Sequence, residues 1–101
     1  MAKNNGFNTA LGFVELPSLA NAIITLDVML KSAAVSFVTW EKKLGGRLVT
    51  IIIEGTVANV AQAVEAAKQN ADIKASLVIA APHPETRKIV RLSAMKYSHI
   101  S

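Results

Sequence analysis

The stretch Trp40-Glu41-Lys42-Lys43-Leu44-Gly45-Gly46-Arg47-Leu48-Val49-Thr50 joins two apolar, β-branched runs through a short basic segment. The two runs are Val35–Trp40 and Leu48–Glu54, and both are rich in residues that favour strands. A short connection with glycines between two such runs is typical of an antiparallel hairpin. Gly45 and Gly46 permit positive φ, so this loop can turn tightly and approach another group closely. We therefore interpret the loop as the candidate functional surface and the flanking elements as its support.

Working outward from the hairpin, hydrophobic spacing predicts one helix on each side of it. Apolar residues recur every three or four positions over Leu19–Ser32, and Ser18 is a suitable N-cap. The same spacing predicts a second helix that begins at Val57 after a Thr56 cap and ends in the turn 70–74. In the first strand of the hairpin, alternation predicts two sets of side chains on opposite faces. One set is Val35, Phe37 and Thr39, and the other is Ser36, Val38 and Trp40.

The two ends of the chain supply the remaining elements. Strands are predicted at Ala10–Leu16 and Ala75–Ala80, followed by a short helix over Glu85–Met95. In that helix we expect Ile89, Leu92 and Met95 to face inward and Arg87, Lys88 and Arg91 to face outward. The order strand, helix, strand, strand, helix, strand predicts an α+β, ferredoxin-like βαββαβ sandwich with both main helices on one face of a four-stranded antiparallel sheet.

At 101 residues the chain corresponds to one domain. We interpret residues 1–9 as a polar, disordered N-terminal lead-in, 10–95 as the domain and 96–101 as a tail. The composition is 51% hydrophobic against 18% charged, which favours burial of the excess apolar surface by self-association. No apolar run approaches the roughly 20 residues of a membrane span, and the N-terminus lacks the apolar centre of a signal peptide. The expected location is the cytosol.

Little in the sequence favours catalysis or metal binding. There are no cysteines and only two histidines, so no ligand set for a metal is evident. For His83, which lies between two prolines, a structural or surface role is favoured over catalysis. No carboxylate pair stands out as general acid and base, and we expect neither enzyme activity nor a cofactor. The net charge of +4 attracts anions, but the run Leu48–Glu54 has no aromatic residue on which a base would stack, which disfavours RNA binding.

Five segments, in order, resemble the single-domain, hexamer-forming shell proteins of bacterial microcompartments, the BMC-domain family. They are Ala10-Leu11-Gly12-Phe13-Val14-Glu15, Asp27-Val28-Met29-Leu30-Lys31-Ser32-Ala33, Trp40-Glu41-Lys42 with Leu48-Val49-Thr50, Gly55-Thr56-Val57, and Ile79-Ala80-Ala81-Pro82-His83. The resemblance implies a cyclic homo-hexamer that tiles edge to edge with other shell proteins into a polyhedral shell around enzymes. It implies that Lys43, Leu44, Gly45, Gly46 and Arg47 line a pore on the six-fold axis. It also implies that Lys31, Pro82 and His83 lie at the edge between hexamers.

The sequence departs from the family pattern at both implied sites. The Gly-Ser-Gly pore loop is replaced by Leu44-Gly45-Gly46-Arg47, with one extra residue, and Ala81 and Glu54 stand where arginines are usual. Six copies of Arg47 around an axis would favour anionic metabolites, sulfate or phosphate over cations. An equally weighted interpretation turns Arg47 sideways toward a carboxylate such as Glu41 or Glu54 of a neighbour. The alternative function is a ferredoxin-like regulatory module that binds a small molecule in an oligomer of lower order.

Overall fold

The computed structural model describes residues 9–42 and 48–90. The elements are β1 (Ala10–Leu16), α1 (Leu19–Ser32), β2 (Ser36–Lys42), β3 (Val49–Gly55), α2 (Val57–Asn70) and β4 (Ala75–Ile79). A further short helix follows over residues 84–90. The predicted lead-in up to Asn8, the loop 43–47, the last part of the predicted C-terminal helix with Arg91, Leu92 and Met95, and the tail 96–101 lie outside the described residues.

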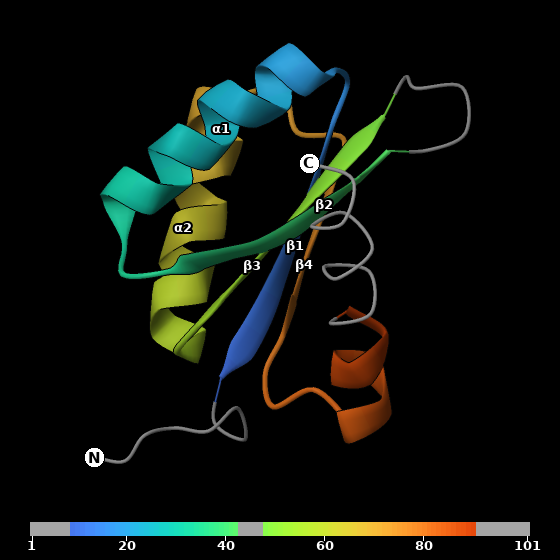
Figure 1. Ribbon diagram of the computed structural model, residues 1–101. Coiled ribbons are helices and arrows are strands. Elements are labelled where there is room, and N and C mark those ends of the chain that lie inside the picture. Colours follow the sequence, from blue (N-terminus) through green and yellow to red (C-terminus); the bar gives the residue numbers. More distant parts are fainter. Residues whose placement is uncertain (1–8, 43–47, 91–101) are drawn as a thin grey trace.

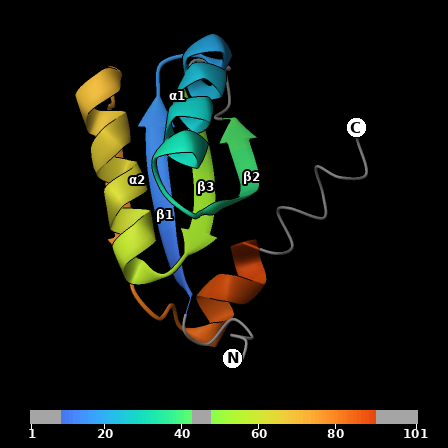
Figure 2. The same ribbon diagram turned by 90° about the vertical axis from the view of Figure 1, so that its left-hand side faces the viewer.

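The four strands form one antiparallel sheet in the order β2-β3-β1-β4. Helices α1 and α2 lie side by side on one face of this sheet, and residues 84–90 lie on the other (Figure 1 and Figure 2). Each helix begins where its cap was predicted: the Ser18 hydroxyl accepts a hydrogen bond from the amide of Asn21, and the Thr56 hydroxyl accepts one from the amide of Asn59. The ferredoxin-like α+β fold is confirmed.

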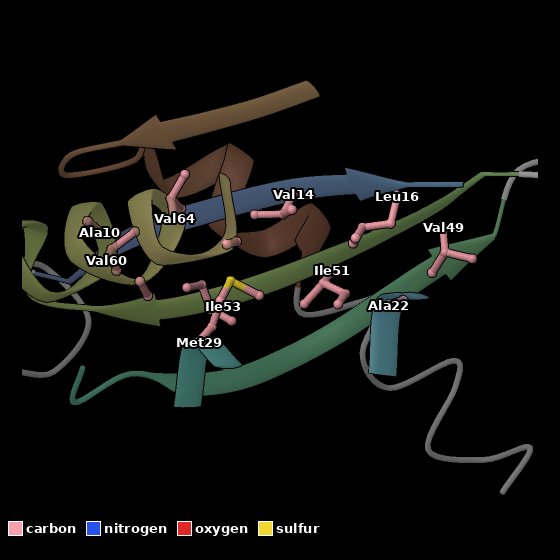
Figure 3. Packing of buried hydrophobic residues seen from close by; sticks show 12 residues of the cluster. Ala10, Val14, Leu16, Ala22, Met29, Val49, Ile51, Ile53, Val60 and Val64 are labelled. Carbon is pink, nitrogen blue, oxygen red and sulfur yellow. The ribbon is translucent and has the colours of Figure 1, made fainter. Parts of the chain in front are cut away.

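The main core lies between the sheet and the two helices (Figure 3). Its largest fully buried members come from every layer: Leu16 and Val14 from β1, Ile51, Ile53 and Val49 from β3, Met29 from α1 and Val60 from α2. The helix α2 contributes only alanine and valine to this core, and such small side chains let a helix approach its sheet closely. The closest approach is at Gly12 of β1, where an added Cβ would lie 2.7 Å from a methyl of Val60.

A β-bulge in β2 overturns the predicted alternation of that strand. Phe37 pairs with Ile53 and Thr39 pairs with Ile52, so Val38 is an extra residue without its own partner on β3. The extra residue resets the pleat, and Trp40 therefore packs against the main core while Val38 packs on the opposite face beside Ile52. The predicted grouping of Phe37 with Thr39 against Trp40 is wrong for this reason.

The predicted orientation of the C-terminal helix is also wrong within its described part. Ile89, expected to face inward, is 67% exposed in the single chain, whereas Val90 is 8% exposed and packs against Leu11 and Ile52. The side chain of Arg87, expected to face outward, is 14% exposed. Arg87 and Val90 are three residues apart and so share one helix face, which is the face that meets the sheet.

Candidate functional site

The two ends of the sheet carry the two groups of residues that the sequence singled out. Lys42 of β2 pairs with Val49 of β3, and this pair closes the hairpin end of the sheet. The predicted pore residues Lys43, Leu44, Gly45, Gly46 and Arg47 connect those strands and lie outside the described residues. The predicted hairpin itself is confirmed by the antiparallel pairing of β2 with β3.

The predicted edge residues follow elements that finish at the opposite end of the sheet. Lys31 lies in the last turn of α1, which leads into the start of β2, where Ser36 pairs with Glu54. Pro82 and His83 follow β4, whose last residues pair with the start of β1. Six residue steps of about 3.3 Å separate the two ends, so the predicted pore end and the predicted edge end are roughly 20 Å apart. Figure 1 shows the hairpin end above and the other end below.

Lys31 is held by a carboxylate on its own helix. Its Nζ lies 2.9 Å from an oxygen of Asp27, one turn earlier, and both side chains are largely exposed. The hydrogen bond from Lys31 to Asp27, helped by the attraction of the two charges, raises the pKa of Lys31. A raised lysine pKa means that the pair is intact at neutral pH and is lost only as the pH rises through that pKa. The pair therefore places an exposed ammonium beside a carboxylate at this end of α1.

Pro82 and His83 form a corner between β4 and the C-terminal helix. Pro82 is buried, and Ala81 before it has a φ of 54°, a left-handed conformation that costs an alanine about 1 kcal/mol or more. His83 is exposed, and its imidazole Nδ1 accepts a hydrogen bond of 3.0 Å from the amide of Glu85. Its carbonyl accepts a second hydrogen bond of 3.1 Å from the amide of Arg87. The side chain and backbone of His83 therefore cap the helix that follows it.

Sequence reasoning missed a contact made by Arg87 at this same end. One guanidinium nitrogen lies 3.4 Å from the carboxylate of Glu54 at the end of β3, and another donates a 3.0 Å hydrogen bond to the carbonyl of Thr9. The signal was present in the sequence: Glu54 stands where the family pattern has arginine, and a carboxylate placed at a partly buried position needs a cation nearby. Arg87 is that cation.

An apolar groove runs between α1 and β2, along one edge of the sheet. It has a volume of about 340 Å³ and is lined by Leu19, Ala22, Ile23, Leu26, Phe37, Trp40, Val49 and Ile51. Ile23 is 61% exposed and Phe37 is 42% exposed in the single chain. Large apolar side chains gathered at an exposed groove mark a surface that contacts a partner.

The described residues offer no centre for metal chemistry. Within residues 9–42 and 48–90, no three histidine or acidic side chains are grouped so that they could hold a metal ion. In the same ranges, no helix has the length and apolar character needed to cross a bilayer.

These features define a ferredoxin-like domain with an apolar groove between α1 and β2 and an exposed Lys31–Asp27 ion pair near one end of the sheet. The family model of the BMC domain matches residues 10–82 of the chain. The chain belongs to the BMC-domain family.

Two of the relatives are named as shell proteins. The chain is 42% identical over 85 residues to the bacterial microcompartment shell protein PduA of Citrobacter freundii, an alignment that covers 80% of this chain and 90% of PduA. It is 35% identical to the carboxysome shell protein CcmK2 of Thermosynechococcus vestitus, covering 73% of this chain and 78% of that protein. Among solved structures it is similar to a microcompartments protein from Desulfitobacterium hafniense DCB, with a TM-score of 0.74 and 26% identity over 85% of this chain. The chain spans 48% of the length of that protein.

Proposed function

We propose that this protein is a structural subunit of a bacterial microcompartment shell in the cytoplasm and is not an enzyme. It forms a homo-hexamer that tiles edge to edge with other shell proteins, and the enclosed enzymes are its further partners. The shell-protein relatives support the role, and the family resemblance supplies the number six. The observation that carries the arrangement is the separation of the hairpin end from the end that holds Lys31, Pro82 and His83. In a ring, one end of each subunit points to the axis and the other to the rim.

Self-association is supported by the two edges of the sheet. Strands β2 and β4 are the outermost strands, so their free edges face in opposite directions. One edge carries the apolar groove with Ile23 and Phe37, and the other carries Leu77, which is 54% exposed. Two different patches on opposite sides are what a head-to-tail contact needs, and such a contact closes into a ring when its rotation fits. We propose that each groove contacts the β4 side of the next copy.

In this ring the residues 43–47 line a central pore. Six copies of Arg47, with Lys43, would surround the axis with positive charge, while Gly45 and Gly46 let backbone amides approach the opening. Such a ring favours small anions, including sulfate or phosphate, and disfavours cations. In the alternative arrangement, Arg47 turns sideways toward a carboxylate of a neighbouring subunit. Glu54 is a less suitable partner for it, because that carboxylate already pairs with Arg87 of its own chain.

The charge of the pore is tested by Arg47→Ala. Conductance through reconstituted assemblies of the parent is expected to favour anions over cations by about tenfold, since removing six like charges from a narrow opening removes most of the field there. Arg47→Ala is expected to lose most of that preference, and Arg47→Lys is the matched control that keeps it. An Arg47→Ala assembly with unchanged ion selectivity would exclude a charged pore ring.

The rim role of Lys31 is tested by its ability to form sheets of hexamers. Lys31→Ala is expected to form rings but to assemble into sheets at least tenfold less readily, because the charged group held by Asp27 is removed from the rim. Negative-stain microscopy across a protein concentration series measures this. Lys74→Ala is the matched control: Lys74 forms a similar exposed pair with Asp72, 3.0 Å apart, near the hairpin end. Equal loss of sheets in both variants would show only a general charge effect.

A further inference from the structure

Arg87 joins three segments that are far apart in the sequence. Its guanidinium contacts Glu54 at the end of β3 and the carbonyl of Thr9 before β1. Its backbone amide donates to the carbonyl of His83. Arg87 thus links the sheet to the Pro82–His83 corner through its own side chain and backbone. Neither the family pattern nor the proposed pore accounts for this linkage.

The surroundings of Arg87 make this linkage more than a surface contact. The Arg87 side chain is 14% exposed and that of Glu54 is 32% exposed, so water screens the pair much less than it screens Lys31 and Asp27. One turn further along, Val90 is buried against Leu11 and Ile52. A charged contact and an apolar contact therefore hold the same helix face against the sheet. Breaking the Arg87–Glu54 pair costs free energy, because a half-buried carboxylate would be left without its cation.

Within the described residues, the buried Pro82 anchors one side of the corner, and the helix that follows holds the other side. Ala81 is in a left-handed conformation, which an alanine keeps only where its surroundings enforce it. The imidazole of His83 accepts a hydrogen bond from the amide of Glu85 in the helix that follows, and this bond moves with that helix. Together with the buried Pro82, the contacts that tie the helix to the sheet therefore fix His83 relative to the sheet.

We propose that Arg87 is a positioning residue for the rim: through Glu54 and Thr9 it fixes the Pro82–His83 corner in the orientation that meets a neighbouring ring. The proposal rests on the proposed shell function, because only in a shell does the corner meet a neighbouring ring. Arg87 holds the corner in place, while Pro82 and His83 make the contact with the neighbouring ring. Opening the Arg87–Glu54 contact frees the corner and leaves the groove between α1 and β2 unchanged, so rings persist while contacts between rings weaken.

The test compares Arg87→Gln with Lys88→Gln in the full-length protein. Both changes remove one positive charge from adjacent positions, but Lys88 is exposed. Hydrogen exchange of the amides in residues 85–90 is expected to quicken about tenfold or more in Arg87→Gln and to stay near the parent rate in Lys88→Gln. Glu54→Gln is expected to resemble Arg87→Gln. Arg87→Lys, which keeps the charge but replaces the planar guanidinium fork by a single ammonium group, is expected to recover part of the protection.

Native mass and microscopy then separate the proposal from the function it rests on. The expected result is that Arg87→Gln forms rings of the parent's mass but assembles into sheets roughly tenfold less readily, whereas Lys88→Gln assembles normally. Unchanged exchange, or unchanged sheet formation despite faster exchange, would overturn the positioning role of Arg87. Loss of the rings themselves would also overturn it, since the groove would then depend on Arg87. If the parent forms no rings, the shell proposal fails, and exchange alone still shows whether Arg87 holds the helix.

Discussion

Replacing Gly12 by alanine is expected to lower the free energy of unfolding by about 1–3 kcal/mol. A Cβ at this position would lie 2.7 Å from a methyl of Val60, 3.1 Å from one side-chain carbon of Ile53 and 3.3 Å from one of Val64. All three neighbours are buried and belong to the main core, so none can swing aside into solvent (Figure 3 shows them). The strand β1 and the helix α2 must therefore separate. Urea unfolding followed by circular dichroism measures the loss.

The double variant Gly12→Ala with Val60→Ala isolates the cause. Removing the two methyls of Val60 opens the space that the new Cβ needs, because the nearest contact is to one of those methyls. The double variant is therefore expected to be more stable than the sum of the two separate losses predicts, by about 1 kcal/mol. Strict additivity would contradict the close approach of β1 and α2 as the reason for the glycine.

Ile23→Glu is expected to dissociate the assembly into single subunits at micromolar concentration. Ile23 lines the groove and is 61% exposed in one chain, so a glutamate there is hydrated when the subunit is alone. In a ring the same carboxylate would be buried against the next copy without a partner, at a cost of several kcal/mol. That cost raises the dissociation constant at each contact by about a hundredfold or more. Sedimentation velocity over a concentration series measures the change.

Ile24→Glu is the matched control for this prediction. Ile24 is 63% exposed on the same helix, but it is not among the residues that line the groove. The two variants have the same charge and a nearly equal change in exposed surface, and both are expected to fold like the parent. Only Ile23→Glu is expected to lose the assembly. If Ile24→Glu dissociates and Ile23→Glu does not, copies associate through a different side of α1.

The sequence predicted the elements well because each carries its own local signal. The periodicity of α1 and α2 and the caps at Ser18 and Thr56 set the helix starts, and the observed boundaries agree closely. The bulge at Val38 escaped prediction because it depends on how β2 meets β3, and nothing in the run of β-branched residues marks the extra residue. Hydrophobic periodicity predicts the wrong face of a strand when pairing with a partner strand introduces an extra residue.

The same distinction applies to the candidate site. The placement of Lys31 and of Pro82–His83 at one end follows from the order of the elements along the chain and the antiparallel sheet, both of which the sequence predicted correctly. The inward face of the C-terminal helix was misjudged because hydrophobicity favoured Ile89, whereas the sheet end offers the carboxylate of Glu54. An ion pair between residues 33 positions apart can be found in a sequence only when the fold has brought the two segments together.

The number of subunits in the purified protein tests the central claim most directly. Native mass spectrometry of the parent is expected to give one dominant species of six subunits, and microscopy of the same sample is expected to show rings whose axis is surrounded by the segment between Lys42 and Leu48. A stable species of two or three subunits would contradict the shell proposal and favour the regulatory module of lower order.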